Sequence, residues 1–387
     1  TSGVHGSPLG ENEFELFLEN IGFSGDPFIH DSEIYSYFDE KRADDNSKFD
    51  EWKANLESKL QSDKNFRQLW NQFNNFETSE VELEWSSDEA SRVIGGKILN
   101  EYGLSNKFII GGSADLAAST KQIISDNTFG SNNFGGNSIE FGIREHAMGG
   151  IVNGLALHSN LIPYGSTFLV FSDYMRPSMR LASLMNVNSL FIFTHDSIYL
   201  GEDGPTHQPI EHLMSLRLIP NLDVIRPSNS MELIHSYRYA LEKRDNPKAI
   251  ILSRQNMKFF DNDVSYKDFQ TGAYEFMPGS DITLIATGSE LELAFEISTK
   301  LKDLSVQIIS APILNRLNEE RLESLSLNQN IFTIELGRTI GWDTYIKNIK
   351  KSFSIDSFGE SAPIDQLAEK FNFNAEKISD EIRSLLN

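Results

Sequence analysis

The sequence contains no cysteine. Disulfide bonds, thiolate metal sites and a cysteine nucleophile are therefore excluded, and the absence fits a reducing compartment such as the cytoplasm. Long apolar runs are also missing, because patches such as residues 190–193 and 249–252 have only the length of strands. Since a membrane-spanning helix needs about 20 apolar residues, no membrane partner is expected.

Basic residues are outnumbered, with 34 Lys and Arg against 56 Asp and Glu and a formal net charge of −22. This charge disfavours binding to nucleic acid or to anionic lipid. It does not exclude anionic small molecules, because a local basic pocket can outweigh the global charge. Hydrophobic residues make up 39% of the chain, which is enough for sizeable cores in two or three domains.

Familiar motifs for nucleotide phosphates and catalytic zinc are absent as well. There is no phosphate-binding loop that ends in Gly-Lys-Ser/Thr, no HExxH and no GxGxxG after a strand. We therefore assign no metal ligand within the chain.

Residues 1–75 differ from the rest and are interpreted as a helical arm. Asn12 is expected to cap a short amphipathic helix that ends before Gly22. A longer helix is expected from about Ser47, because apolar residues recur at helical spacing from Phe49 to Phe73. This arm needs a surface against which it can pack.

Residues 76–272 alternate between short apolar runs and helical stretches. Ser86 and Glu89 have the spacing of a capping box that opens a helix, which closes near Gly103. Buried strands are expected at 108–110, 189–194, 222–225 and 249–252, and helices at 145–157, 171–185 and 230–242. This alternation predicts an α/β domain with a parallel sheet covered by helices.

Residues 273–387 repeat the pattern after a break near 271–278. Strands are expected at 282–286, 306–309 and 331–334, with helices at 291–301 and after Gly341 and Pro363. A second, smaller α/β domain is therefore predicted at the carboxyl end.

Two neighbouring segments carry candidate chemistry. In Ile139-Glu-Phe-Gly-Ile-Arg-Glu-His-Ala-Met148, Glu145 is either an ordinary helix-start charge, favourable to the helix dipole, or a functional carboxylate. Phe168, Phe171 and Tyr174 follow at intervals of three residues. On a helix they form either a core stripe or a flat apolar slot for a heteroaromatic ring.

A polar loop runs from Thr194 to Pro209 and begins where an apolar strand ends, which is where open α/β sheets place their sites. It carries His195, Glu202, Asp203 and His207, and glycines and prolines shape it. Because the spacing fits no common zinc pattern, a polar substrate pocket is the better interpretation. Ser253-Arg-Gln255 also follows a strand, where an Arg can bind an anion.

Five segments in series resemble the transketolase family in order and spacing. They are Gly111-Gly-Ser-Ala-Asp-Leu116, Arg144-Glu-His-Ala-Met-Gly149, Gly201-Glu-Asp-Gly-Pro-Thr-His-Gln208, Ser253-Arg-Gln-Asn256 and Phe358-Gly-Glu-Ser-Ala-Pro363. The resemblance covers essentially the whole chain and is weakest in the acidic arm. It implies a thiamine-diphosphate-binding fold, with a pyrimidine-binding α/β domain at 76–272 and a smaller C-terminal α/β domain at 273–387.

The start of the chain, Gly3-Val-His-Gly-Ser-Pro-Leu-Gly10, resembles a segment near the end of the family's first domain. By this resemblance His5 is a catalytic residue that touches both the cofactor's diphosphate and the substrate. The rest of that domain is expected to be absent. It contains the metal-binding Asp and Asn and the glycine-rich turn that hold the diphosphate through Mg²⁺ or Ca²⁺. The chain alone is then expected to be inactive and to bind thiamine diphosphate weakly.

The resemblance also implies a site for the cofactor's aminopyrimidine. Glu145 hydrogen-bonds a ring nitrogen and so favours the imino tautomer, whose nitrogen takes the proton from the thiazolium carbon. Phe168, Phe171 and Tyr174 match the aromatic wall around the ring, and Phe171 is the best single match. Asp115 matches an acid near the cofactor.

For the substrate, the resemblance implies a sugar site and a phosphate site. His207 matches a group that orients the sugar or transfers a proton, and Asp203 one that accepts a hydrogen bond from a sugar hydroxyl. His195, Ser119 and Arg254 match residues that hold the terminal phosphate.

The family has a further phosphate-binding Arg near the start of this domain's first helix, in the context Thr-Arg-x-x-Ser. The segment aligned with it is Ser87-Asp-Glu-Ala-Ser91, which places Asp88 at the position of the Arg. An acid cannot hold a phosphate, whereas Arg92 lies one helical turn further on and could substitute. A weaker phosphate site is therefore expected.

The implied function is that of transketolase in the pentose phosphate pathway: transfer of a two-carbon ketol unit from a ketose phosphate, such as xylulose 5-phosphate, to an aldose phosphate. The family builds its sites between the two subunits of a homodimer. Deoxyxylulose phosphate synthase and the beta subunits of 2-oxoacid dehydrogenases share the arrangement, but the Gly201–Gln208 loop favours transketolase.

The alternative is a catalytically inactive transketolase-like assembly or regulatory protein. The expected absence of the first domain and Asp88 favour it. Retention of Glu145, His207 and Arg254 argues against it, because a scaffold does not need them together.

Overall fold

The computed structural model of the chain describes residues 3, 5–26, 28–75, 81, 87–124, 127–258, 260 and 264–386. It divides into two compact units, residues 1–71 and residues 72–387. The domain boundaries expected at residues 76 and 273 stay predictions.

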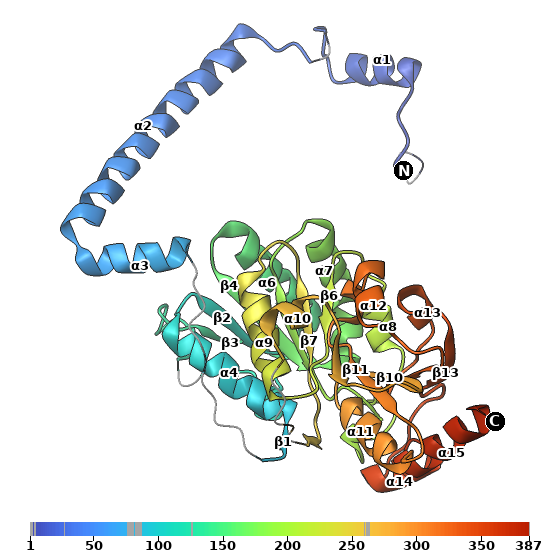
Figure 1. Ribbon diagram of the computed structural model, residues 1–387. Helices are drawn as coiled ribbons and strands as arrows, with labels where there is room; N and C mark the ends of the chain where they lie inside the picture. Colours follow the sequence, from blue (N-terminus) through green and yellow to red (C-terminus); the bar gives the residue numbers. More distant parts are fainter. Residues whose placement is uncertain are drawn as a thin grey trace. The chain divides into compact units, whose positions relative to one another are not determined.

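The first unit is helical in its described part. Its helices are α1 (Glu11–Asn20) and α2 (Ser32–Ser62), and α3 (Lys64–Asn74) begins in it (Figure 1). The expected helix from Ser47 therefore begins 15 residues earlier, at Ser32. It also stops at Ser62, because the Asp63 carboxylate accepts a hydrogen bond of 2.9 Å from the backbone N–H of Phe66 and so opens α3. The expected cap at Asn12 is wrong, since Gly10 is the N-cap residue of α1.

A six-stranded parallel sheet forms the centre of the second unit's first part, in the strand order β3-β2-β4-β5-β7-β6. Its strands are β2 (Ile109–Ser113), β3 (Ser138–Glu140), β4 (Ile162–Phe168), β5 (Leu190–Thr194), β6 (Asp223–Ile225) and β7 (Lys248–Ile251). Every neighbouring pair is parallel. The predicted parallel sheet is confirmed.

Helices cover both faces of this sheet. On one face lie α4 (Ser91–Ser105), α9 (Ser230–Glu242) and α10 (Tyr266–Gln270), and on the other α6 (Glu145–His158), α7 (Ser172–Leu184) and α8 (His212–Arg217). Along β5, Leu190 and Ile192 belong to the first core, and Phe191 and Phe193 to the second. The strand is apolar throughout because both of its faces are buried.

The sequence pattern misses strand β4, which lies between β2 and β5. Pro163, Gly165, Ser166 and Thr167 give it a polar, broken appearance, although all seven of its residues are buried. The Ser166 hydroxyl donates to the backbone carbonyl of Gly112 at 3.3 Å. Burial of Ser166 is thus compensated by a hydrogen bond that composition does not reveal.

The capping box proposed for the first helix of this part is also not the start of α4. The helix begins at Ser91 after Ala90, whose side chain makes no capping hydrogen bond. Ser86 lies outside the described residues. Glu89 instead belongs to the short strand β1 (Glu89–Ala90), which pairs with β8 (Asn256–Met257).

A second, five-stranded sheet follows in the order β13-β12-β10-β11-β9. Its strands are β9 (Tyr274–Met277), β10 (Ile282–Ala286), β11 (Val306–Ser310), β12 (Ile331–Ile334) and β13 (Ile349–Phe353). Only β9, at an edge, is antiparallel to its neighbour in this sheet. The predicted smaller α/β domain is confirmed, and β9 and β13 are strands that the sequence pattern misses.

Helices cover this sheet too. On one face lie α11 (Glu290–Lys300), α14 (Ile364–Lys370) and α15 (Ala375–Leu386), and on the other α12 (Glu319–Ser324) and α13 (Trp342–Tyr345). Short helical turns occur at α5 (Ala117–Thr120), η2 (Leu169–Phe171), η3 (Ile198–Leu200) and η4 (Leu314–Arg316). None of the helices in the described ranges combines the length and the apolar composition that a membrane span requires.

The glycines of β2 are a structural requirement that can be tested. A Cβ atom at Gly111 would lie 2.0 Å from the carbonyl oxygen of Tyr164, so Gly111→Ala must displace strand β4. We expect this change to lower the free energy of unfolding, measured by chemical denaturation, by about 1–3 kcal/mol. Gly130→Ala is the control, since no atom lies within 4 Å of its Cβ position, and it should change stability by less than about 0.5 kcal/mol. Equal effects of the two changes would contradict the steric argument.

Candidate active site

The predicted site residues of the second unit follow the carboxyl ends of adjacent parallel strands. Asp115 comes two residues after β2, Phe168 ends β4, His195 follows β5 and Arg254 comes three residues after β7. Parallel strands bring their carboxyl ends to one edge of the sheet, where open α/β folds bind ligands. Chain direction alone therefore gathers these side chains.

Three aromatic rings form a stacked wall at this edge. The rings of Phe168 and Phe171 are 5.8 Å apart and 7° from parallel, and those of Phe171 and Tyr174 are 6.0 Å apart and 24° from parallel. The rings line up as the spacing suggests, but not on one α-helix. Phe168 ends a strand, Phe171 ends the 3₁₀ turn η2, and Tyr174 lies in α7. The tight 3₁₀ turn places residues three apart above one another.

Glu145 is the first residue of α6 and is 9% exposed. It lines a pocket of about 530 Å³ together with Asp115, the three aromatic side chains and His207. No residue that the structure describes donates a hydrogen bond to its carboxyl group. The site thus presents a flat aromatic face and one unpaired carboxyl group, which suits a planar heteroaromatic ring with a nitrogen at its edge.

His195 lies against the outer side of this wall. Its ring centroid is 3.6 Å from that of Phe168, and its Nδ1 shares a hydrogen bond of 2.8 Å with the Thr194 hydroxyl. Burial, followed by the charges of Arg92 and Arg254 and the nearby His207, lowers the pKa of His195 to about 3. The imidazole is therefore neutral at physiological pH.

Arg92 and Arg254 line a second pocket of about 720 Å³, which extends to residues of the C-terminal sheet domain. Burial and the neighbouring charge of Arg254 lower the pKa of Arg92. Neither guanidinium has an acidic partner among the described residues, and Arg92 donates to the backbone carbonyl of Ser119. Glu292 and Glu296 also line this pocket, but the two guanidinium groups without an ion-pair partner beside a neutral histidine offer donors for an anion.

Asp88 does not belong to this cationic group. Its side chain is exposed, it does not line the pocket that contains Arg92 and Arg254, and its charge instead raises the pKa of Glu292 after the larger effect of burial. Arg92 thus lines the pocket and Asp88 does not, and the expected weakening of a phosphate site by Asp88 stays a prediction.

The polar loop, residues 194–209, is hydrogen-bonded to the C-terminal domain. The Gln208 amide donates to the backbone carbonyl of Glu360 at 2.9 Å, and the Ser361 hydroxyl donates to that of Glu202. A Cβ atom at Gly359 would overlap the Gln208 amide oxygen, which explains the glycine. The loop brings a half-buried His207 to the aromatic wall, 5.7 Å from Phe171 between ring centroids, and leaves Asp203 exposed.

Two strained residues mark the same edge. Asp115 and His195 have left-handed backbone conformations with φ of 60° and 61°, which cost of order 1–3 kcal/mol each. Such conformations persist where surrounding structure fixes them, and they concentrate at binding sites.

The structure does not place every predicted residue. His5 lies exposed in the first unit, so its role stays a prediction. No metal ligand was assigned from the sequence, yet Asp173, Glu211 and His212 offer ligand atoms within 4.8 Å of one another. The two acids of that group are exposed, and Asp173 hydrogen-bonds His212 at 3.2 Å, so the group serves as a contact between α7 and α8.

Sequence reasoning missed the buried charges behind the site. Arg226, which follows β6 directly, is fully buried with Asp196 and Glu290. The position of Arg226 at the carboxyl end of a strand was the sequence feature that could have indicated these charges.

Models of three protein domains match the chain. The model described as transketolase, pyrimidine binding domain matches residues 90–259, and the transketolase-like C-terminal domain matches residues 272–374. The model described as transketolase, thiamine diphosphate binding domain matches residues 1–76.

Full-length relatives agree with these matches. A transketolase of Staphylococcus aureus is 39% identical over 413 residues, which cover 100% of this chain and 61% of the relative. Among solved structures, a transketolase of Leishmania mexicana has a TM-score of 0.90 at 29% identity, covering 98% of this chain and 58% of the other. A transketolase of Pichia stipitis in complex with sedoheptulose-7-phosphate has a TM-score of 0.91 at 28% identity, covering 99% and 60%. The chain thus spans about three-fifths of the length of these relatives.

The expectation that the first domain is absent is wrong, because residues 1–76 match its model. The expectation rested on the missing metal ligands and glycine-rich turn of that domain. The matched segment instead forms helices α1, α2 and α3 in its described part. The expected inactivity and weak cofactor binding rested on that absence and lose their basis.

The low pKa of His195 predicts a dependence of stability on pH. Since the folded-state pKa of about 3 lies below the ordinary 6.5, the unfolded chain gains a proton here below pH 6.5 and the folded chain does not. Stability is then lost as the pH falls, by about 1.4 kcal/mol per pH unit from this group. Denaturant unfolding at pH 7.5 and 5.5 should show this loss, and His195→Asn should reduce it.

His158→Asn is the matched control, because His158 is exposed at the end of α6. It should leave the pH dependence of the wild type intact. An unchanged dependence in His195→Asn would show that His195 is protonated in the folded chain.

Proposed function

We propose that this chain, which carries the pyrimidine-binding and C-terminal domains of the transketolase family, transfers a two-carbon ketol unit from a ketose phosphate to an aldose phosphate with thiamine diphosphate. The observation that carries the proposal is the unpaired Glu145 carboxyl group beside stacked aromatic rings, next to a cationic group of Arg92 and Arg254. A cofactor ring and a sugar phosphate are the two ligands that such neighbouring sites suit.

The residues present fit the aminopyrimidine half of thiamine diphosphate. The parallel rings of Phe168 and Phe171 offer a flat apolar wall, and Tyr174 extends it. Asp115 lines the same pocket. When bound, the cofactor supplies an electron sink for the two-carbon unit.

Glu145 is the proposed catalytic acid. Glu145 is buried, with 9% of the residue exposed, and its carboxyl group can hydrogen-bond a ring nitrogen at the edge of the bound pyrimidine. Such a hydrogen bond is stronger there than in water, because the surroundings have a low dielectric constant. His5 is proposed as a further catalytic residue that contacts the cofactor and the substrate, on the resemblance alone.

The sugar is proposed to lie between the aromatic wall and the polar loop. His207, hydrogen-bonded through Nδ1 to the Thr206 hydroxyl at 2.9 Å, is oriented to transfer a proton to or from a sugar hydroxyl. Asp203 accepts a hydrogen bond from another hydroxyl and so reads its configuration.

The terminal phosphate is proposed to bind Arg92 and Arg254, with His195 and Ser119 completing the phosphate subsite. Arg92, which lines the pocket, is proposed to substitute for the family's Arg at the position of Asp88, and a weaker phosphate subsite stays a prediction. Two guanidinium groups can each donate two hydrogen bonds to a phosphate.

Mg²⁺ or Ca²⁺ is proposed to hold the cofactor's diphosphate, since residues 1–76 match the diphosphate-binding domain; no ligand residue is assigned. A cytoplasmic location and the pentose phosphate pathway are proposed with the activity.

A homodimer is also proposed. Helices α6 and α7 pack against each other and expose Ile151, Leu157, Leu181 and Leu184. Exposed apolar side chains grouped on one face favour a contact with another subunit.

The central test concerns Glu145. Glu145→Gln preserves shape and removes the ionisable proton, so the protein should fold. Hydrogen–deuterium exchange at the reactive ring carbon of bound thiamine diphosphate should slow by about 100- to 10,000-fold, the range of positioned acid–base groups. Glu140→Gln, the same change at an exposed residue that ends β3, should leave exchange unaltered. If Glu145 were only a helix-start charge, its loss would change stability by about 0.3–1 kcal/mol and leave exchange intact.

The phosphate subsite gives a second test. Arg92→Gln should raise the KM for an aldose 5-phosphate by about tenfold or more, because one charge-assisted hydrogen bond contributes about 1.5–3 kcal/mol. The KM for the same aldose without phosphate should barely change. Lys97→Gln, on the same helix but paired with Glu89 at the surface, is the control. A similar rise for both acceptors would remove Arg92 from the phosphate subsite.

A further inference from the structure

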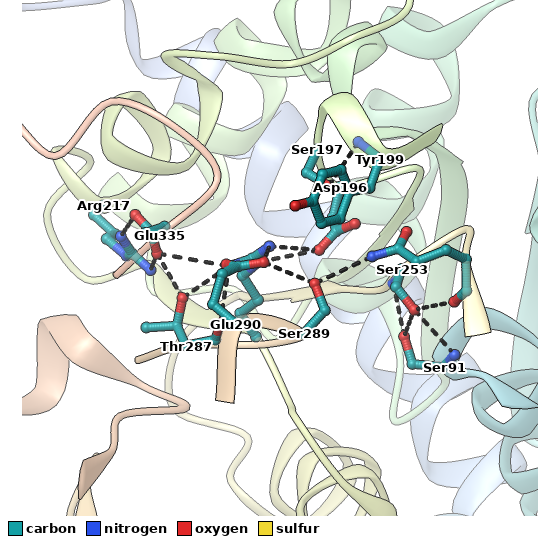
Figure 2. Close-up of polar contacts among 12 residues, drawn as sticks. Ser91, Asp196, Ser197, Tyr199, Arg217, Ser253, Thr287, Ser289, Glu290 and Glu335 are labelled. Atoms are coloured by element: carbon teal, nitrogen blue, oxygen red, sulfur yellow. Dashed lines mark hydrogen bonds and ion pairs between the residues drawn. The ribbon is translucent and has the colours of Figure 1, made fainter. Parts of the chain in front are cut away.

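The residues of the proposed phosphate subsite share a feature that the subsite itself does not explain. Arg92, His195 and Arg254 each have a direct sequence neighbour that is buried or half-buried and held by side-chain hydrogen bonds. These neighbours are Ser91, Asp196, Ser253 and Gln255. Figure 2 shows that their contacts form a chain that reaches into the C-terminal domain.

The first contact joins the two arginine-bearing segments. The Ser91 hydroxyl accepts from the backbone N–H of Ser253 at 2.6 Å, and the Ser253 hydroxyl accepts from that of Ser91 at 3.2 Å. The two hydroxyl oxygens are 3.0 Å apart. This reciprocal pair fixes the start of α4 against the end of β7, and therefore fixes Arg92 relative to Arg254.

The second contact joins the Arg254 segment to the C-terminal domain. The Gln255 amide donates to the Ser289 hydroxyl at 3.1 Å, and this hydroxyl donates to Glu290 at 2.7 Å. Ser289 is the N-cap residue of α11 and Glu290 is the first residue of that helix, shortly after β10 ends. The backbone that carries Arg254 is thus connected to the carboxyl edge of the second sheet.

The third contact joins the His195 segment to the same loop. Asp196 accepts two hydrogen bonds from Arg226, at 2.7 and 3.1 Å. Arg226 in turn donates to Glu290 and to the backbone carbonyl of Thr287, the latter at 3.0 Å. His195 needs such support, because its left-handed backbone is strained.

The loop itself is anchored in the second sheet. The Thr287 hydroxyl donates to Glu335 at 2.6 Å, and Arg217 makes a bidentate pair with the same carboxylate at 2.7 and 2.8 Å. Glu335 directly follows β12 and is fully buried. The loop therefore has one defined position.

We propose that the Thr287–Glu290 loop of the C-terminal domain positions the phosphate subsite, with Ser289 setting Arg254 through Gln255 and Glu290 setting His195 through Arg226 and Asp196. The inference rests on the proposed function, because it assigns a determinant of phosphate recognition to a domain that supplies none of the predicted phosphate ligands. A displacement of the order of 1 Å is enough to weaken a hydrogen-bonded subsite.

Ser289 offers the gentlest test, since it is half-buried and uncharged. In the purified protein, Ser289→Ala should raise the KM for an aldose 5-phosphate about two- to tenfold, the effect of one neutral hydrogen bond. Turnover with the same aldose without phosphate should stay within twofold, and Ser289→Thr, which keeps the hydroxyl, should restore the KM. Ser298→Ala is the matched control, because its hydroxyl only donates to the Phe295 carbonyl within α11.

A double-mutant cycle with Gln255→Met separates positioning from direct contact. If Ser289 acts through Gln255, the double variant should lose no more than the larger single loss. Additive losses would show that Ser289 acts by itself and would overturn the proposal.

Arg254→Gln distinguishes this inference from the proposed function. If Arg254→Gln does not change the preference for phosphorylated acceptors, the phosphate subsite itself is wrong. If it does and Ser289→Ala does not, the subsite stands and positioning by the C-terminal domain is refuted. Asp196→Asn tests the second branch, and its failure to fold would leave the Ser289 cycle as the deciding measurement.

Discussion

The buried guanidinium of Arg226 is the interaction on which the rest of this structure depends. It is fully buried between the two sheets, and its hydrogen bonds go to Asp196 on one side and to Thr287 and Glu290 on the other. A charge without partners in such a place is strongly destabilising. The two sheets can therefore approach only in the arrangement that completes these contacts, and that arrangement places the second sheet beside the pocket that Arg92 and Arg254 line.

Charge also explains how an acidic chain can bind an anion. Acids outnumber bases over the whole chain, and Glu292 and Glu296 line the same pocket as Arg92 and Arg254. The buried acids behind the pocket are paired with Arg226 and Arg217, whereas Arg92 and Arg254 have no ion-pair partner in the described residues. Their guanidinium groups therefore keep donors for an anion, and the neutral His195 adds no repulsion between cations.

Much of the fold could be predicted because it follows from local patterns. The strand at 282–286 and the helix at 230–242 have the predicted bounds, since apolar runs and helical periodicity reflect burial directly. Strand β4 could not be predicted, because Ser166 and Thr167 are buried through hydrogen bonds or tight packing that only the assembled sheet provides. The residues of the aromatic wall were predicted, but their secondary structure was not. A strand end followed by a 3₁₀ turn places them at the same three-residue interval as a helix would.

The candidate site shows the same limit more sharply. Resemblance pointed to residues that line the two pockets, such as Glu145 and Arg254. The residues that support the site were not identified at all. Arg226 and Glu290 are 64 positions apart in the sequence, and they form their hydrogen bond only because the two sheets pack together. The C-terminal domain contacts both loops of the site, the polar loop through Gln208 and Glu360 and the Arg254 segment through Ser289. A domain that holds both loops at once fixes their separation, which under the proposed function is the distance from the sugar site to the phosphate site.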